Sequence, residues 1–295
     1  MELPDIASAL SPFIPEGTLS DAQLSQVSVY LDLLLQWNAK INLTAVRSPD
    51  EILTRHFGES FFLAHQLRNH QVTKSANQQV IDLGSGAGFP GLPLKIYAPN
   101  LCVTLIESNQ KKATFLGEVI RALKLTGINV FASRAEGYLA QIKHSESTGH
   151  ETATPSKDLS SRAMGARASR ASTSRGTVPL PLDKNKSINN LKAPHETMNR
   201  STDEPILVTL RAVEHFDRIL PLAGHLLTES PNYEITKSPN ILALLIGSSQ
   251  LPVAHRLLPH FAWDAPIPVP LSRSRILLFG HPPQEPRNEE REPAS

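Results

Sequence analysis

Residues 79–91 read Gln-Val-Ile-Asp-Leu-Gly-Ser-Gly-Ala-Gly-Phe-Pro-Gly, an apolar run that ends in a glycine-rich turn. The apolar part predicts a buried strand, and Pro90 suits the first turn of a helix that follows. Glycine at positions 84, 86 and 88 permits positive φ and lets a ligand approach the backbone closely. A helix that begins here directs its free amides at the turn, which favours an anionic group.

Outward from this turn, short apolar runs alternate with helical patterns. The predicted strands are 79–84, 101–108, 128–133, 206–212, 241–247 and 275–280, and the predicted helices between them are 111–125 and 213–227. Strands that alternate with helices favour parallel pairing in a doubly wound α/β sheet. Ligands of such sheets bind beyond the carboxyl ends of the strands, where residues 84–91 are expected to lie.

The first 70 residues predict a helical N-terminal lobe. Ser20 and Gln23 have the spacing of a capping box, and leucines and a valine then recur at helical intervals up to Trp37. A second helix is predicted from Ser48-Pro49-Asp50-Glu51, with Ser48 as the cap and Glu51 reaching back to it.

The remaining chain is predicted to be one α/β domain, 71–280, with an interruption. Residues 143–203 contain no Phe, Trp or Tyr and are rich in Ser, Thr and Asn. Such a segment buries too little apolar surface to offset its chain entropy, so we expect a disordered insertion there and a disordered tail over 281–295.

The composition argues against disulfide-bonded, zinc-binding, membrane and secreted proteins. Among 295 residues, 29 Lys and Arg stand against 28 Asp and Glu, so the net charge of +1 decides nothing about a nucleic-acid partner. Cys102 is the single cysteine, which excludes an internal disulfide or a cysteine-based zinc cluster, and we expect no metal. No apolar run has the length of a membrane helix, and the acidic start MELPDIASAL does not resemble a signal peptide. These features predict a cytoplasmic protein without a membrane segment.

Two acids accompany the glycine-rich turn. Asp82 stands at its head, and Glu107 ends the next predicted strand, where a carboxylate can accept both hydroxyls of an adenosine ribose. Gly86-Ala87-Gly88-Phe89-Pro90-Gly91 matches the dinucleotide pattern G-x-G-x-x-G, but in poor register with the strand. Read from the strand, D-x-G-x-G-x-G is similar to the first motif of class I adenosylmethionine-dependent methyltransferases. We favour that interpretation, because Asp82 suits a cofactor that carries an ammonium and a sulfonium. A purely structural role, in which Asp82 caps a tight turn, stays open.

A longer string of motifs resembles one family. Its members are the bacterial small-subunit rRNA guanine-N7 methyltransferases, also called RsmG, GidB or glucose-inhibited division protein B. The string consists of W-N-x-x-x-N-L-T-x-V-R (37–47), R-H (55–56), D-L-G-S-G-A-G-F-P-G-L-P-L (82–94) and S-R-A-E (133–136). The resemblance is strong over about residues 20–140 and weak over 205–280.

The resemblance implies a class I methyltransferase fold and a cytoplasmic enzyme, which we expect to be a monomer. It implies methylation of N7 of a guanine in 16S rRNA, free or in a small-subunit precursor, with S-adenosylmethionine as cofactor. The cofactor-binding positions that it implies, together with the turn residues above, are Asp82, Gly84, Gly86, Gly88, Phe89, Glu107, Ala135, Glu136 and Arg211. Among these, Gly84 and Phe89 would line the methionine part, and Ala135 and Glu136 would flank the adenine. No catalytic residue is named, because guanine N7 needs no general base.

The sequence departs from the family pattern at a few positions. Leu210 replaces a serine before Arg211, Ile246 stands where a lysine is usual, and Glu59 stands where an aspartate is usual. These changes keep open an RNA-binding homologue with weak or no activity. An NAD-dependent oxidoreductase is a further alternative.

Several other polar residues allow two interpretations. His56 could be a packed histidine or an RNA contact, and Arg47 and Arg55 could pair with acids on their own helix. Lys111 and Lys112 are expected to be solvated, and Trp37 is expected to pack in the core.

Overall fold

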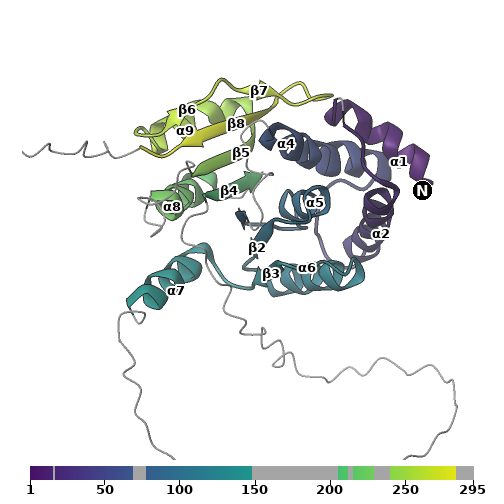
Figure 1. Cartoon of the computed structure of the whole chain (residues 1–295), viewed down its shortest axis with the longest axis horizontal. Coiled ribbons are helices and arrows are strands. Elements are labelled where there is room, and N and C mark those ends of the chain that lie inside the picture. The colour runs from purple at the N-terminus through teal and green to yellow at the C-terminus, as the bar shows by residue number, and fades with distance from the viewer. Residues whose placement is uncertain (16, 69–77, 148–204, 212–214, 229–239, 284–295) are drawn as a thin grey trace, which may run out of the picture. The chain divides into compact units, whose positions relative to one another are not determined.

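A computed structural model describes residues 1–15, 17–68, 78–147, 205–211, 215–228 and 240–283 (Figure 1). The expected insertion beyond residue 147 and the tail beyond 283 lie outside the described residues. No described helix is long and apolar enough to cross a membrane. Within the same residues, no three His, Cys, Asp or Glu side chains are grouped so that they could hold a metal ion.

The fold is built around one twisted sheet. Its strands are β1 (Gln79–Leu83), β2 (Cys102–Ile106), β3 (Ile128–Phe131), β4 (Ile206–Arg211), β5 (Ile241–Gly247), β6 (Ala262–Trp263), β7 (Ile267–Pro268) and β8 (Arg275–His281). They follow the order β3-β2-β1-β4-β5-β8-β6, with β7 also paired to β8. The pairs from β3 to β5 are parallel, as the sequence predicts. The strand β8 runs antiparallel to β5, so the expectation of parallel pairing is wrong for this strand.

Alternate residues of the central strands face two different hydrophobic cores, because successive side chains of a strand point to opposite faces of the sheet. In β5, Ala243 and Leu245 belong to the core shared with the N-terminal helices. Leu242 and Leu244 belong to the core on the other face, with Phe216 of α8. Burial on both faces explains why this strand reads as a continuous apolar run.

The helices cover both faces of the sheet (Figure 1). On the first face lie α1 (Leu3–Leu10), α2 (Asp21–Asn38), α3 (Pro49–Ile52), a π-helical segment (Leu53–Gly58), α4 (Glu59–Leu67), α5 (Gly91–Tyr97) and α6 (Gln110–Ala122). Against the second face lie α7 (Ala135–Ser147), α8 (Phe216–Thr228) and α9 (Leu251–Leu257). Short 3₁₀ turns occupy Ser11–Phe13 and Ser248–Gln250.

The two predicted capping boxes differ in outcome. Ser20 accepts a hydrogen bond from the Gln23 amide at 3.3 Å, and Gln23 accepts one from the Ser20 amide at 2.9 Å, so the first box is confirmed. Ser48 precedes α3 without a side-chain cap, so the second prediction is wrong. Pro49 does occupy the first helical position.

Other differences concern boundaries. The sequence patterns do not predict α1, α7, α9 or the short strands β6 and β7. Residues 143–147 belong to α7, so the predicted start of the insertion is too early, and His281 ends β8, so the predicted start of the tail is too early as well. The predicted helix 213–227 is observed as Phe216–Thr228, and Arg211 is the last residue of β4 and does not follow it. These short or polar segments take their structure from packing, which a single sequence shows poorly.

Candidate functional site

The glycine-rich turn lies at the topological switch point of the sheet. From β1 the chain runs outward through β2 and β3, then returns to place β4 on the other side of β1. A crevice at the carboxyl ends of the strands is the usual ligand site of such sheets. Here Gly84, Gly86 and Gly88 all adopt positive φ, of 70°, 58° and 94°. Residues with a side chain rarely adopt this conformation, so the turn depends on glycine.

Asp82 lies beneath the turn and supports it. It is 0% exposed. One carboxylate oxygen accepts from the Gly91 amide at 3.2 Å and the other from the Thr209 hydroxyl at 2.9 Å. Burial raises the pKa of Asp82 to about 6, although the hydrogen bonds from Thr209, Ser85 and Gly91 oppose that rise. Asp82 therefore joins β1, β4 and α5, the structural role that the sequence reading had left open.

Glu107 reaches the turn from the end of β2. Its carboxylate accepts from the Gly86 amide at 2.8 Å and from the Asn109 amide at 2.7 Å. It is 7% exposed, and its partners are backbone amides. The acid thus stands at the turn, as its place in the sequence predicts, and fixes the approach of the chain to α6.

The turn has an open side and a closed side. Among the residues that the structure describes, a Cβ atom added to Gly86 would meet only the Gly84 carbonyl oxygen, at 3.8 Å. A Cβ atom added to Gly88 would lie 2.3 Å from a Leu92 methyl and 2.6 Å from the Tyr30 hydroxyl. Gly86 therefore borders free space that a ligand could fill, whereas Gly88 is packed into the core.

Phe89 belongs to the closed side. Its ring is 5% exposed and stacks on Tyr30 at a centroid distance of 5.3 Å. Phe57 meets it edge-on at 5.0 Å, and the guanidinium of Arg211 lies 5.9 Å above it. The side chain therefore joins the N-terminal helices to the turn.

Arg211 anchors a buried polar network at the end of β4. Its guanidinium donates to Glu59 at 2.9 and 3.2 Å, to the Arg55 carbonyl, and to Nδ1 of His56 at 2.8 Å. Glu59 also pairs with Arg275 of β8 at 3.6 Å. Burial lowers the pKa of Arg211, and the charge of Glu59 opposes this. The network thus ties the π-helical segment and α4 to β4 and β8.

The network fixes the state of His56. Because arginine only donates, Nδ1 of His56 accepts from Arg211, and Nε2 carries the proton that faces the Thr44 hydroxyl at 2.7 Å. Burial lowers the pKa of His56 to about 3, and the charges of Arg211 and Arg55 add to the shift. His56 is therefore neutral and serves packing and hydrogen bonding.

The remaining predicted site residues lie around the same edge of the sheet. Glu107 donates its amide to the Phe131 carbonyl at 3.2 Å, which joins the ends of β2 and β3. Ala135 and Glu136 begin α7 directly after β3, where Ala135 is buried and Glu136 is exposed. Gly84 is exposed at the mouth of the turn.

Sequence reasoning missed the partners that hold this site. Thr209 lies opposite Asp82 in the register of β1 and β4, and Gly91 lets α5 approach Asp82 and Leu105 closely. Glu59 was noted as a departure from a pattern, yet it is the acid that neutralises Arg211. The other two departures, Leu210 and Ile246, are fully buried in the second core.

Comparisons with known proteins agree with the resemblance over part of the chain. The family model of GidB, rRNA small subunit methyltransferase G, matches residues 23–165. A protein of Streptococcus thermophilus named ribosomal RNA small subunit methyltransferase G is 45% identical over 120 residues, which cover 41% of this chain and 49% of that protein. A protein of the same name from Chloroflexus aggregans is 48% identical over 118 residues, or 40% and 47% of the two chains. The chain thus matches about half the length of these curated relatives.

Solved structures are more distant. An O-methyltransferase from Bacillus cereus is 11% identical with a TM-score of 0.46, over 86% of this chain and 90% of that one. The fold is established by the sheet itself, which is doubly wound and parallel from β3 to β5 with an antiparallel β8. It agrees with the predicted class I methyltransferase fold. The matched range 23–165 contains Asp82, the glycines, Glu107 and Glu136, and it ends before Arg211.

Proposed function

We propose that this chain, whose residues 23–165 match the family model of rRNA small subunit methyltransferase G, transfers a methyl group from S-adenosylmethionine to N7 of a guanine in 16S rRNA. The observation that carries the proposal is the open side of the glycine turn. Gly86 borders free space at the switch point, and the Glu107 carboxylate stands beside it. This pairing of bare backbone and acid is what an adenosyl cofactor requires.

The residues of the open side fit S-adenosylmethionine. Glu107 would hold the ribose hydroxyls, as an acceptor-only carboxylate at the end of β2 can. The backbone of Gly84 and Gly86 would pass beneath the methionine part, where a side chain would occupy the free space. Ala135 and Glu136 would lie beside the adenine, after β3. Asp82 and Arg211 would support the site without contacting the cofactor, because both are buried and already paired with protein groups.

The reaction requires these residues to position the methyl donor and the guanine relative to one another. When bound, S-adenosylmethionine supplies an electrophilic methyl group, and guanine N7 supplies an exposed lone pair, so no proton has to be removed. Alignment of two reactants can contribute about 7–11 kcal/mol to catalysis. The Arg211 network would keep the ends of β4 and β8 in place against α4, and Asp82 would hold the turn against α5. A substrate in 16S rRNA would place the enzyme in the cytoplasm.

The first test is a calorimetric titration of the full chain with S-adenosylhomocysteine. We expect binding in the wild type, and at least about tenfold weaker binding in Glu107→Ala, because a charged hydrogen-bond acceptor contributes roughly 1.5–3 kcal/mol. The matched control is Glu51→Ala, which removes an exposed glutamate from α3 and should leave the affinity unchanged. A wild type that binds NAD and not S-adenosylhomocysteine would favour the oxidoreductase alternative and overturn the proposal.

The second test concerns the substrate. Mass spectrometry of 16S rRNA from cells with and without the gene should show one 7-methylguanosine fewer in the deletion. Complementation with the wild-type gene should restore it, and Glu107→Ala should restore less. If S-adenosylhomocysteine binds but the 7-methylguanosine content stays constant, the chain is an inactive homologue or acts on another substrate.

A further inference from the structure

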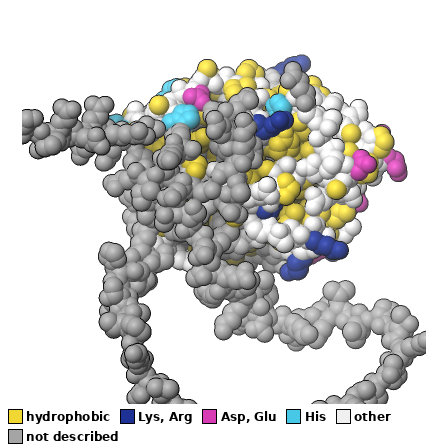
Figure 2. All heavy atoms as spheres, in the orientation of Figure 1, with side chains coloured by type: hydrophobic (Ala, Val, Ile, Leu, Met, Phe, Trp, Pro, Cys, Tyr) yellow, Lys and Arg dark blue, Asp and Glu magenta, His cyan; other side chains and the backbone are white. Residues whose placement is uncertain are grey.

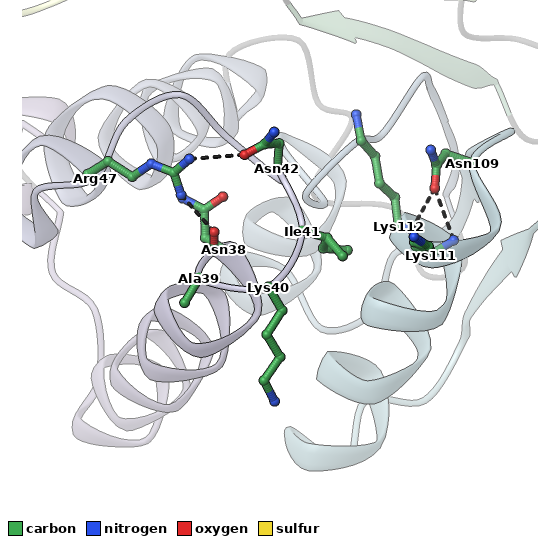
Figure 3. Close-up of a pocket in the computed structure, with 9 residues that line it drawn as sticks. All are labelled: Asn38, Ala39, Lys40, Ile41, Asn42, Arg47, Asn109, Lys111 and Lys112. Atoms are coloured by element: carbon green, nitrogen blue, oxygen red, sulfur yellow. Dashed lines mark hydrogen bonds between the residues drawn. The ribbon is translucent and has the colours of Figure 1, made fainter. Parts of the chain in front are cut away.

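A groove of about 570 Å³ opens between the loop that follows α2 and the start of α6. It is lined by polar and basic residues, namely Asn38, Ala39, Lys40, Ile41, Asn42, Arg47, Asn109, Lys111 and Lys112. Figure 3 shows the loop from Asn38 to Arg47 on one side and the first turn of α6 on the other, with Ile41 between them. We call this feature the basic groove.

The basic groove carries an uncompensated positive charge. Its lining contains three lysines and one arginine and no carboxylate. Lys40 and Lys111 are exposed and Lys112 is half-buried. Within the described residues, none of these three ammonium groups is part of an ion pair. Lysines that merely cover a solvated helix need no facing wall, whereas here Lys40 belongs to one wall and Lys112 to the other.

Both walls are held by side-chain amides. The Asn38 carbonyl oxygen of the side chain accepts from the Leu43 and Thr44 amides at 2.9 and 3.0 Å, and Arg47 donates to the Asn38 backbone carbonyl at 2.7 Å. Asn109 caps α6 by accepting from the amides of Lys111 and Lys112 (Figure 3). The loop and the helix start are therefore fixed before a ligand arrives, which lowers the entropic cost of binding.

The groove adjoins the cofactor side of the molecule. The amide of Asn109 donates to Glu107, the acid beside Gly86, at 2.7 Å. The other wall is joined to the closed side, since Thr44 contacts His56, which accepts from Arg211, so the link to the open side runs through Asn109 and Glu107. A polymer bound in the groove would thus pass close to the open side of the turn.

We propose that the basic groove binds the sugar–phosphate backbone of the RNA strand next to the target guanine, an inference that rests on the proposed function. Lysine and arginine bind phosphates without reading sequence, and amides of asparagine also contact phosphate and sugar oxygens. The lining contains no aromatic ring, so it offers no platform on which bases would stack. Trp37 is near in sequence, but its ring lies 5.7 Å from Phe115 and packs against the core.

Among the described residues, the rest of the visible surface carries no broad basic area, which agrees with RNA binding at one local site (Figure 2). In Figure 2, Lys and Arg side chains stand in small separate groups on a face with much hydrophobic and uncharged surface. The net charge of +1 likewise leaves no general attraction for RNA. The groove therefore concentrates positive charge that the whole chain lacks.

The binding test uses a 5′-fluorescein-labelled single-stranded RNA of 12 nucleotides and fluorescence anisotropy at several KCl concentrations. We expect the double variant Lys40→Gln, Lys112→Gln to bind about tenfold more weakly. The slope of log K against log salt should also fall by about 1.4, the value for two phosphate contacts to a single strand. The removal of a cation from the first turn of α6 should not weaken that helix. The control Arg256→Gln removes one exposed cation on α9 and should change the affinity less than twofold.

A methylation assay then separates the inference from the function on which it rests. With a 16S rRNA transcript, the double variant should raise KM for RNA about tenfold, with kcat and the affinity for S-adenosylhomocysteine within twofold of wild type. Unchanged RNA affinity and KM would overturn the groove inference and leave the methyltransferase proposal intact. A wild type that binds the RNA through these lysines but binds no S-adenosylhomocysteine would overturn the proposed function instead. A wild type that does not bind the labelled RNA at all would overturn the groove.

Discussion

Two glutamates of nearly equal burial stand on opposite sides of the glycine turn. Glu59, on the closed side, is 4% exposed, and Glu107, on the open side, is 7% exposed. The carboxylate oxygens of Glu59 pair with the charged side chains of Arg211 and Arg275. The carboxylate oxygens of Glu107 accept hydrogen bonds from two backbone amides, those of Gly86 and Asn109. Similar burial therefore accompanies two different kinds of partner.

This difference separates structural support from ligand binding. A charge that is paired with a buried arginine cannot exchange partners, because the arginine would be left without compensation. A carboxylate bound by amides at the mouth of a turn can accept further hydrogen bonds, since each oxygen has a second lone pair. The closed side thus supports the turn, and the open side is where a ribose can bind.

The largest expected effect comes from Glu59→Ala. This variant leaves Arg211 buried without its counter-charge and should lower the free energy of unfolding by about 3–5 kcal/mol. Glu107→Ala exposes two amides that water can reach, and should cost only about 1 kcal/mol. Urea unfolding followed by circular dichroism measures both.

The variant Glu59→Asp serves as the control, because it keeps the charge and shortens the side chain by one methylene. It should retain more than half of the stability that Glu59→Ala loses. If Glu59→Ala and Glu107→Ala were equally destabilising, the division into a closed and an open side would fail.

The glycines of the turn provide a second, smaller contrast. Gly88→Ala forces a methyl group against Leu92 and Tyr30, and should lower the free energy of unfolding by about 2–4 kcal/mol through overpacking and an unfavourable φ. Gly86→Ala meets free space and should cost about 1 kcal/mol. Binding of S-adenosylhomocysteine should respond in the opposite order, with at least a tenfold loss in Gly86→Ala. Equal losses of stability in the two variants would contradict the placement of the free space.

The sequence was sufficient to predict the parts of this site that are local. The strand 79–83, the three glycines with positive φ and the Ser20 capping box all depend on neighbouring residues, and all three can be derived from propensity and spacing. Glu107 could be predicted from its place at the end of the second strand, and the family resemblance added Arg211 as a candidate.

The partners across the sheet could not be predicted in this way. Thr209 reaches Asp82 across 127 residues of chain, and Glu59 reaches Arg211 across 152. These contacts depend on strand register and on how α4 packs, and neither is encoded by local pattern. For the same reason β8 was expected to be parallel, although its apolar run reads the same in either direction.

The last prediction is a pH dependence of stability that tests whether the closed side excludes water. Burial depresses the pKa of His56 from 6.5 in the unfolded chain to about 3 in the native protein. The unfolded state therefore binds the extra proton first, so this contribution to stability is complete above pH 6.5 and is lost as the pH falls toward 3. Between pH 7 and pH 5 the wild type should lose up to about 2 kcal/mol through His56.

Asp82 acts in the other direction, because burial raises its native pKa from 3.8 to about 6. The native protein binds a proton more readily than the unfolded chain in this window, so acidification from pH 7 to pH 5 stabilises it by roughly 1 kcal/mol. A comparison of His56→Gln with wild type removes this term, since Asp82 is common to both. Urea unfolding at pH 5 and pH 7 should therefore show that the variant, less stable at pH 7, loses up to about 2 kcal/mol less on acidification. If both proteins lost the same unfolding free energy between pH 7 and pH 5, His56 would take up a proton as readily in the native protein as in the unfolded chain. Water would then reach His56, and the closed side would not be closed.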